Sequence, residues 1–218
     1  MTARLPNRML FRFELPVHRR REPPRIDGRL ADWDDGYRLP PLGAIDKVQE
    51  WGQVYAAWDE AGLYIACRVT GKTHPLRCDP HRFWKGDNLR LMTDMRDTRN
   101  IHRASRFCQH FYFLPTGGGP NGRDPVAASA RVHRATQNAP LIPPGRIPVA
   151  AEVTSTGYSL EALIPAACLS GFDPVENPRI GLYYMLEDAD HGQQYLTVGD
   201  DMPWWVDPSL WATAVLQP

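Results

Sequence analysis

The chain has 218 residues, enough for one β-sandwich or two small domains, and we predict a single domain over residues 1–218. Its 25 basic and 25 acidic residues cancel, which argues against a global field toward nucleic acid or an anionic membrane, so we expect neither as a partner. Because the charges balance, we expect the partner to be small or neutral. Hydrophobic residues make up 43% of the chain, enough to fill a core.

The N-terminal part of the chain predicts one strand and one short helical piece. Residues 10–17 alternate apolar and polar side chains, which predicts a strand, and a basic turn follows at 18–24. Residues 26–33 predict a turn into the helical piece, in which Asp27 is suited to capping and Trp33 to anchoring on a sheet edge.

Residues 1–21 contain no continuous apolar segment before Pro16 and no small-residue cleavage site, so they do not resemble a secretory signal. No stretch approaches the roughly 18 apolar residues of a membrane span. We therefore expect a soluble and, by default, cytoplasmic protein, although a chain trimmed of its leader would look the same.

A hairpin is predicted where residues 54–58 and 63–70 flank the tight turn 59–62. In the second strand the apolar side chains recur at every other position and so share one face of the sheet. These residues are Leu63, Ile65, Cys67 and Val69. The other face is partly polar, which is typical of a half-covered antiparallel sheet.

Further strand-like segments follow at short spacing to the end of the chain. They are residues 88–94, 106–114, 149–154, 159–164, 179–187 and 211–216. Residues 116–146 are rich in Gly, Pro, Asn and Arg and predict a long surface loop with one short strand at 126–133. About nine strands, short helical turns and many loops predict an all-β fold, an antiparallel β-sandwich of immunoglobulin or jelly-roll type.

The four cysteines lie far apart without a CxxC pair, so neither a zinc ribbon nor a redox motif is indicated. Cys67 and Cys168 fall in apolar segments and fit a core as free thiols. Cys78 and Cys108 have more polar surroundings, and a disulfide between them is the alternative to free thiols.

Five landmarks, in the same order along the chain, resemble the family 9 carbohydrate-binding modules. They are Ile26-Asp27-Gly28 with Asp32-Trp33, Trp58-Asp59 before Gly62-Leu63-Tyr64-Ile65, Trp84 with Gly86-Asp87, the segment from Gly157 to Pro165, and Ile180-Gly181 leading to Asp188. The resemblance spans residues 26–216 and is most specific at 157–165. It implies a DOMON-like β-sandwich, usually appended to secreted glycanases, that binds polysaccharide chain ends without cleaving them and often carries structural calcium.

The resemblance also implies a site in which two tryptophans sandwich a sugar. Trp84 matches the first by its place three residues before Asp87, and Trp204 or Trp205 is the best candidate for the second. A pyranose suits such a site because its apolar C–H face stacks on an indole while its hydroxyls stay free. Three residues past the aspartate the family usually has a ligand-facing glutamate; Arg90 stands here, a cation in place of a hydrogen-bond acceptor.

Residues 97–110 form the densest polar cluster in the chain. On a strand, Arg106, Cys108 and His110 share one face, and His102 can approach from the preceding loop. We interpret the cluster as a hydrogen-bonded loop over the sandwich, with a polar ligand site including Arg106 and His110, or a zinc or copper site, as alternatives.

Two acidic segments, 187–192 and 199–201, supply the oxygen ligands that calcium prefers. Neither has EF-hand spacing, and solvated acidic loops are the alternative. Asp188 and Asp190 are the first candidate ligands.

Catalytic motifs are missing from the sequence. Ser159 and Ser170 lack a nucleophile elbow, and nothing places Asp87 and Glu161 about 5 to 9 Å apart, as a glycosidase pair requires. We expect Glu161 to point toward solvent or a basic partner. The protein is therefore predicted not to be an enzyme.

A haem-binding relative of the DOMON class is a rival hypothesis, because such domains use axial Met and His ligands. Met92, Met95, His102 and His110 are candidates, but no spacing singles out a pair.

Together these patterns predict non-catalytic binding of a carbohydrate or a similar polar ligand, with a structural or protein-interaction sandwich that has lost sugar binding as the alternative. The candidate ligand-binding residues are Trp84, Asp87, Arg90, Arg106, His110, Trp204 and Trp205.

Overall fold

A computed structural model describes residues 6–218 and confirms an all-β, largely antiparallel β-sandwich. The strands are β1 (Glu14–His18), β2 (Gly52–Asp59), β3 (Gly62–Thr70), β4 (Asn88–Asp94), β5 (Cys108–Gly118), β6 (Asp124–Ala130), β7 (Val149–Thr154), β8 (Gly157–Pro165), β9 (Arg179–Asp188), β10 (Gly192–Tyr195) and β11 (Ala212–Gln217). The helices are short 3-10 turns: η1 (Asn7–Leu10), η2 (Leu30–Asp32), η3 (Asp35–Tyr37), η4 (Leu42–Asp46), η5 (Pro80–Arg82), η6 (Ala166–Cys168) and η7 (Pro208–Leu210). Among these described elements, no helix has the length and apolar character to cross a membrane.

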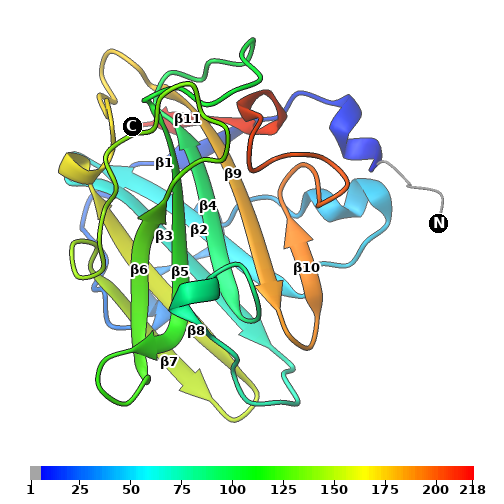
Figure 1. Ribbon diagram of the computed structural model, residues 1–218, viewed down its shortest axis with the longest axis vertical. Helices are drawn as coiled ribbons and strands as arrows, with labels where there is room; N and C mark the ends of the chain where they lie inside the picture. Colours follow the sequence, from blue (N-terminus) through cyan, green and yellow to red (C-terminus); the bar gives the residue numbers. More distant parts are fainter. Residues whose placement is uncertain (1–5) are drawn as a thin grey trace.

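The strands form two sheets. The seven-stranded sheet has the order β1-β11-β9-β4-β5-β6, with β10 added beside β9, and the four-stranded sheet has the order β2-β3-β8-β7. Figure 1 shows the strands β6, β5, β4 and β9 in front, with the four-stranded sheet crossing behind them. Every pairing is antiparallel except that of β1 with β11, which is parallel.

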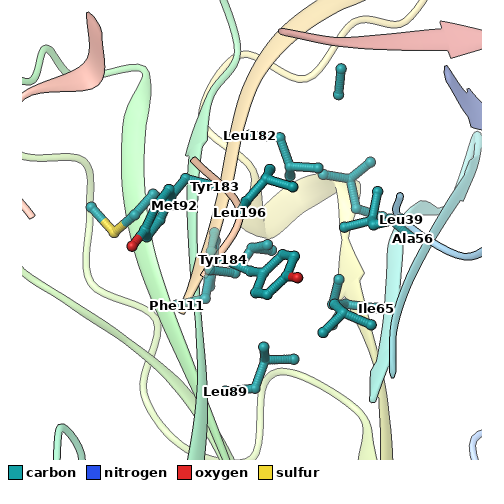
Figure 2. Packing of buried hydrophobic residues seen from close by; sticks show 14 of the residues in the cluster. Leu39, Ala56, Ile65, Leu89, Met92, Phe111, Leu182, Tyr183, Tyr184 and Leu196 are labelled. Atoms are coloured by element: carbon teal, nitrogen blue, oxygen red, sulfur yellow. The ribbon is translucent and has the colours of Figure 1, made fainter. Parts of the chain in front are cut away.

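The core lies between the sheets. Leu89, Phe111 and Tyr184 from the seven-stranded sheet face Ile65 and Ala56 of the other sheet (Figure 2). Because side chains alternate along a strand, the residues beside these inner ones point the opposite way. We call the opposite side of the seven-stranded sheet, where Met92 and Tyr183 lie, its outer face.

The four-stranded sheet is covered on both faces at one end, which differs from the predicted half-covered sheet. A second apolar cluster packs residues of η2 and the following turn onto β2 and β3. Its buried members are Leu30, Trp33, Tyr55, Ala57, Tyr64 and Ala66. Only the far end of β3 keeps the predicted polar face, at Arg68 and Thr70. The predicted helical piece at 26–33 is thus a cover for this sheet.

The predicted hairpin is confirmed as β2 and β3. Gly62 in its turn has φ +147, and a Cβ atom there would lie 2.0 Å from the carbonyl oxygen of Ile164. Only glycine fits, because any side chain would strike the backbone of β8.

Several predicted boundaries are wrong. The first strand begins only at Glu14, because residues 7–10 form η1 and leave Leu10 exposed. The predicted loop 116–146 begins later than expected, since β5 continues to Gly118, and the short strand predicted within it at 126–133 is β6, which pairs with β5. Pro115 lies where the register of this pairing shifts, and a proline is tolerated at such an irregularity because it lacks the N–H that a regular ladder uses. β10 is an additional strand.

All four cysteines are free, so the alternative disulfide is wrong and the predicted free thiols are confirmed. Cys67, Cys108 and Cys168 are buried and Cys78 is partly buried. Burial raises the pKa of the Cys67 thiol to about 12, which keeps it protonated and unreactive at neutral pH.

Candidate ligand-binding site

A pocket of about 580 Å³ lies on the outer face of the seven-stranded sheet. Arg90 precedes Met92 by two residues on β4, and His110 pairs with Met92 from β5, so both belong to this face. The pocket is lined by Phe83, Trp84, Arg90, His110, Arg131, His133, Asp200, Trp204 and Trp205. Five of the seven residues predicted to bind ligand therefore meet here, from segments more than 100 residues apart.

Trp84 forms one exposed aromatic surface of the pocket. The preceding η5 is capped by Asp79, whose side chain accepts a hydrogen bond from the His81 N–H. Phe83 then stacks on Tyr112 of β5, with ring centroids 4.2 Å apart and planes inclined by 13°. Trp84 stands at 90° to Phe83 and is 46% exposed. Its ring is therefore held in place yet retains free area for a ligand.

Trp204 and Trp205 have different roles. Trp204 is only 1% exposed: it stacks on Tyr183 at 4.8 Å, and its Nε1 donates to Asp200 Oδ1 at 3.1 Å. Trp205 is 36% exposed and stands at 89° to Trp204. Of the two candidates for the second stacking ring, Trp205 has the exposed surface. Trp204 is buried and forms the floor of the pocket.

Arg90 lies against that floor, with its guanidinium carbon 5.0 Å from the centroid of the Trp204 ring. Its Nη2 donates to Glu187 Oε2 at 2.6 Å. Burial lowers the pKa of Arg90 and raises that of Glu187, so each ion is removed from water and stabilised by the other. A carboxylate from β9 thus lies beside Arg90 in the wall of the pocket.

Sequence reasoning missed Glu187 as a neighbour of the site. The signal was present, because alternation along residues 179–187 places Glu187 on the same face as Tyr183. What the sequence did not provide is the pairing of β4 with β9, which sets Asn88 opposite Glu187 and brings Arg90 within reach.

His110 contributes a neutral imidazole. Burial and the positive charge of Arg90 lower its pKa to about 3, so the ring is uncharged at neutral pH. Phe83 contacts it edge-on at 5.5 Å. Within residues 6–218, the buried Nε2 has no hydrogen-bond partner.

Three lining residues come from loops that the sequence did not connect with the site. Arg131 and His133 follow β6 and are exposed. Asp200 accepts hydrogen bonds from Trp204 Nε1 and, at 2.7 Å, from Gln193 Nε2. These loops thus add an arginine, a histidine and a carboxylate acceptor to the wall beside the indole rings.

Asp87 and Arg106 lie outside the pocket. Asp87 is fully buried, and its Oδ1 accepts a hydrogen bond from Lys72 Nζ at 2.8 Å. Arg106 lies over the ring of Phe107, with its guanidinium carbon 4.9 Å from the ring centroid. Neither residue lines the pocket that holds the exposed tryptophans.

The polar cluster at 97–110 is divided among different surroundings. His102 Nδ1 lies 3.0 Å from Asp207 Oδ2, Cys108 is buried, and His110 lines the pocket. The described part of the chain holds no group of three or more His, Cys, Asp or Glu side chains placed to bind a metal ion. This arrangement fits the interpretation of a hydrogen-bonded loop.

The two predicted calcium ligands are engaged by the protein itself. Asp188 Oδ2 accepts from Lys72 Nζ at 2.8 Å, and Asp188 Oδ1 accepts from the backbone N–H of Asp190. Asp190 Oδ2 accepts from the backbone N–H groups of Thr73 and His74 at 2.7 and 3.0 Å. These donors lower the pKa of Asp190, so its carboxylate is held in the charged form by the protein alone.

Glu161 does not point toward solvent, contrary to the sequence prediction. It is fully buried on β8, where its Oε1 accepts from the backbone N–H groups of Asp27 and Gly28, both at 2.8 Å. Its Oε2 accepts from Trp33 Nε1 at 3.0 Å. The physical reason is the cover over this sheet, which seals Glu161 beneath it. Two of the landmarks, 26–33 and 157–165, therefore meet in one hydrogen-bond cluster.

The fold is similar to that of solved carbohydrate-binding proteins. A carbohydrate binding module family 9 from Caldicellulosiruptor kristjanssonii in complex with cellotriose matches with a TM-score of 0.62 and 14% identity, covering 94% of each chain. The same kind of module in complex with glucose matches with a TM-score of 0.61 and 14% identity, over 93% of this chain and 95% of that one.

A protein from Bacteroides uniformis assigned to carbohydrate binding matches with a TM-score of 0.52 and 12% identity, over 94% of this chain and 99% of that one. No protein-family model and no curated protein matches the sequence. At these identities the similarity establishes the fold.

Proposed function

We propose that this chain is a non-catalytic carbohydrate-binding module of the family 9 type, which binds a saccharide in the pocket on the outer face of the seven-stranded sheet. The observation that carries the proposal is the pair of part-exposed indoles, Trp84 and Trp205, at the rim of a pocket of about 580 Å³. The two similar modules solved with cellotriose and glucose support the same ligand class.

Stacking supplies the contact. The apolar face of a pyranose packs on an indole, which buries area on both partners while the ring hydroxyls project sideways. We expect weak and reversible binding, with a Kd of roughly 1 μM to 1 mM, equivalent to about 4 to 8 kcal/mol.

The polar wall supplies orientation. Sugar hydroxyls both donate and accept, and the pocket offers donors on Arg90 and Arg131 and an acceptor on Asp200. Glu187 balances the charge of Arg90. Because Arg90 is already paired with Glu187, a neutral sugar that covers the arginine does not bury an unpaired charge.

Catalysis is not part of the proposal. Asp87 is bound to Lys72, while Glu161 lies under the cover of the four-stranded sheet with three donors on its carboxylate. Neither carboxyl group is among the residues that line the pocket.

The experiment is isothermal titration calorimetry with cello-oligosaccharides and glucose. It compares the parent with the two rim variants, Trp84→Ala and Trp205→Ala, and with the control Trp51→Ala. Trp51 stacks on His191 at 5.1 Å and does not line the pocket. We expect each rim variant to lose at least about tenfold in affinity, or about 1.4 kcal/mol, and the control to bind like the parent.

Unchanged affinity in both rim variants would refute the stacking role. A folded parent that binds nothing on a broad glycan array would instead favour the alternative, a structural or protein-interaction sandwich that has lost sugar binding.

A further inference from the structure

Charged side chains from both sheets meet at one end of the sandwich. Lys72 comes two residues after the end of β3, Asp87 immediately precedes β4, and Asp188 is the last residue of β9. Lys72 Nζ lies 2.8 Å from Asp87 Oδ1, 2.8 Å from Asp188 Oδ2 and 3.8 Å from Asp190 Oδ2. One ammonium is thus surrounded by three carboxylates.

Most of this cluster is buried, and Asp190 lies at its edge. Lys72, Asp87 and Asp188 are all buried, and the side chain of Asp190 is only 10% exposed. The three carboxylates outnumber the single ammonium. Within residues 6–218, the other titratable side chain bonded to them is His74, which pairs with Asp190 at the surface. Buried carboxylates repel one another strongly unless a cation lies between them.

The carboxylates are oriented by backbone groups rather than by the lysine alone. Asp87 accepts from the N–H groups of Arg77 and Ala189, and Asp188 accepts from those of Asp190 and His191. Each aspartate is held by loop backbone and turns one oxygen toward Lys72 Nζ. The anionic cage is therefore defined by the fold, and Lys72 is the cation placed inside it.

We propose that Lys72 is a built-in substitute for a metal ion, occupying the place that a divalent cation would take between Asp87, Asp188 and Asp190, so that this fold needs no calcium there. Calcium binds carboxylate oxygens at about 2.3 to 2.6 Å. It cannot share the cage with an ammonium 2.8 Å from the same oxygens. The calcium that the family resemblance implies therefore does not fit these residues while Lys72 is present.

The inference concerns stability and does not depend on the proposed saccharide site. It predicts that the cage becomes a cation site once the ammonium is removed. Lys72→Ala vacates the space, whereas Lys72→Met removes the charge but leaves an unbranched side chain in the cage.

The test compares thermal unfolding of the parent and both variants in EDTA and in millimolar calcium, with equilibrium dialysis to count bound ions. We expect the same unfolding temperature for the parent in both conditions. Lys72→Ala should unfold at a lower temperature in EDTA, recover in calcium and bind one ion. Lys72→Met should be destabilised in both conditions.

A further control is Lys72→Ala combined with Asp188→Asn, which should lose the response to calcium and so exclude binding elsewhere on the chain. A parent whose unfolding temperature falls in EDTA or rises in calcium would overturn the proposal without any variant. If Lys72→Ala does not fold in EDTA, refolding on addition of calcium supports the inference, and failure to refold or to bind calcium overturns it.

Discussion

Replacing Glu161 with glutamine alters one atom in the hydrogen-bond cluster that holds residues 26–33 on the four-stranded sheet. Glu161 Oε1 already accepts two backbone N–H groups, so the glutamine must keep its oxygen there. Its NH₂ group then faces Trp33 Nε1, the donor that lies 3.0 Å from Oε2 in the parent. The glutamine NH₂ group and the Trp33 indole N–H, both donors, would then face each other at a buried position without an acceptor between them.

The expected cost follows from that mismatch. Leaving one buried donor unsatisfied costs about 1 to 3 kcal/mol, and for a chain of this size that lowers the unfolding temperature by about 2 to 12 °C. Burial raises the pKa of Glu161, so the carboxylate carries a desolvation cost that glutamine relieves. The net loss should therefore fall within this range rather than above it.

The assay is denaturant and thermal unfolding at neutral pH, run as a double-mutant cycle with Trp33→Phe. Phenylalanine removes the indole N–H, so Glu161→Gln should cost less in that background, and the difference measures the Trp33 contact. A glutamine variant as stable as the parent, or a cycle with no coupling, would refute the argument that the carboxylate is fixed by these donors.

Two further predictions concern the pocket. The folded pKa of His110, about 3, lies below its ordinary value of 6.5, so the unfolded chain takes up a proton first as the pH falls. The free energy of unfolding therefore falls by up to about 1.4 kcal/mol for each pH unit as the pH is lowered from about 6.5 to about 3. His110→Gln should lack this loss in unfolding measured across that range, and identical pH profiles would contradict the assignment. Trp204→Ala should cost about 3 to 5 kcal/mol in unfolding free energy because it empties the floor under Arg90, whereas Trp84→Ala should cost far less. A small cost at Trp204 would mean that it is not the floor.

The strand pattern predicted most of the fold because alternation is a local signal. Residues 63–70, for example, already show which side chains enter the core. The segment 26–33 was recognised as a turn and helical piece, but the sequence did not reveal which surface it covers. That depends on contacts with β8, more than 125 residues away, and the buried state of Glu161 follows from them.

The candidate site was predicted in part for a similar reason. The place of Trp84 before the strand and the outward face of Arg90 are local properties, and both residues line the pocket. Trp204 and Trp205 are neighbours on one loop, and no local signal indicates which ring stacks on Tyr183. Arg131 and His133 reach the pocket through the path of a loop, which strand periodicity does not describe.

The parallel pairing of β1 with β11 has a consequence for the order of folding. β11 lies between β1 and β9, so the first strand joins the seven-stranded sheet only through its pairing with the last strand. Such pairing across the full sequence raises contact order and slows folding. It also means that removing β11 would leave β1 without the strand that it pairs with in this sheet.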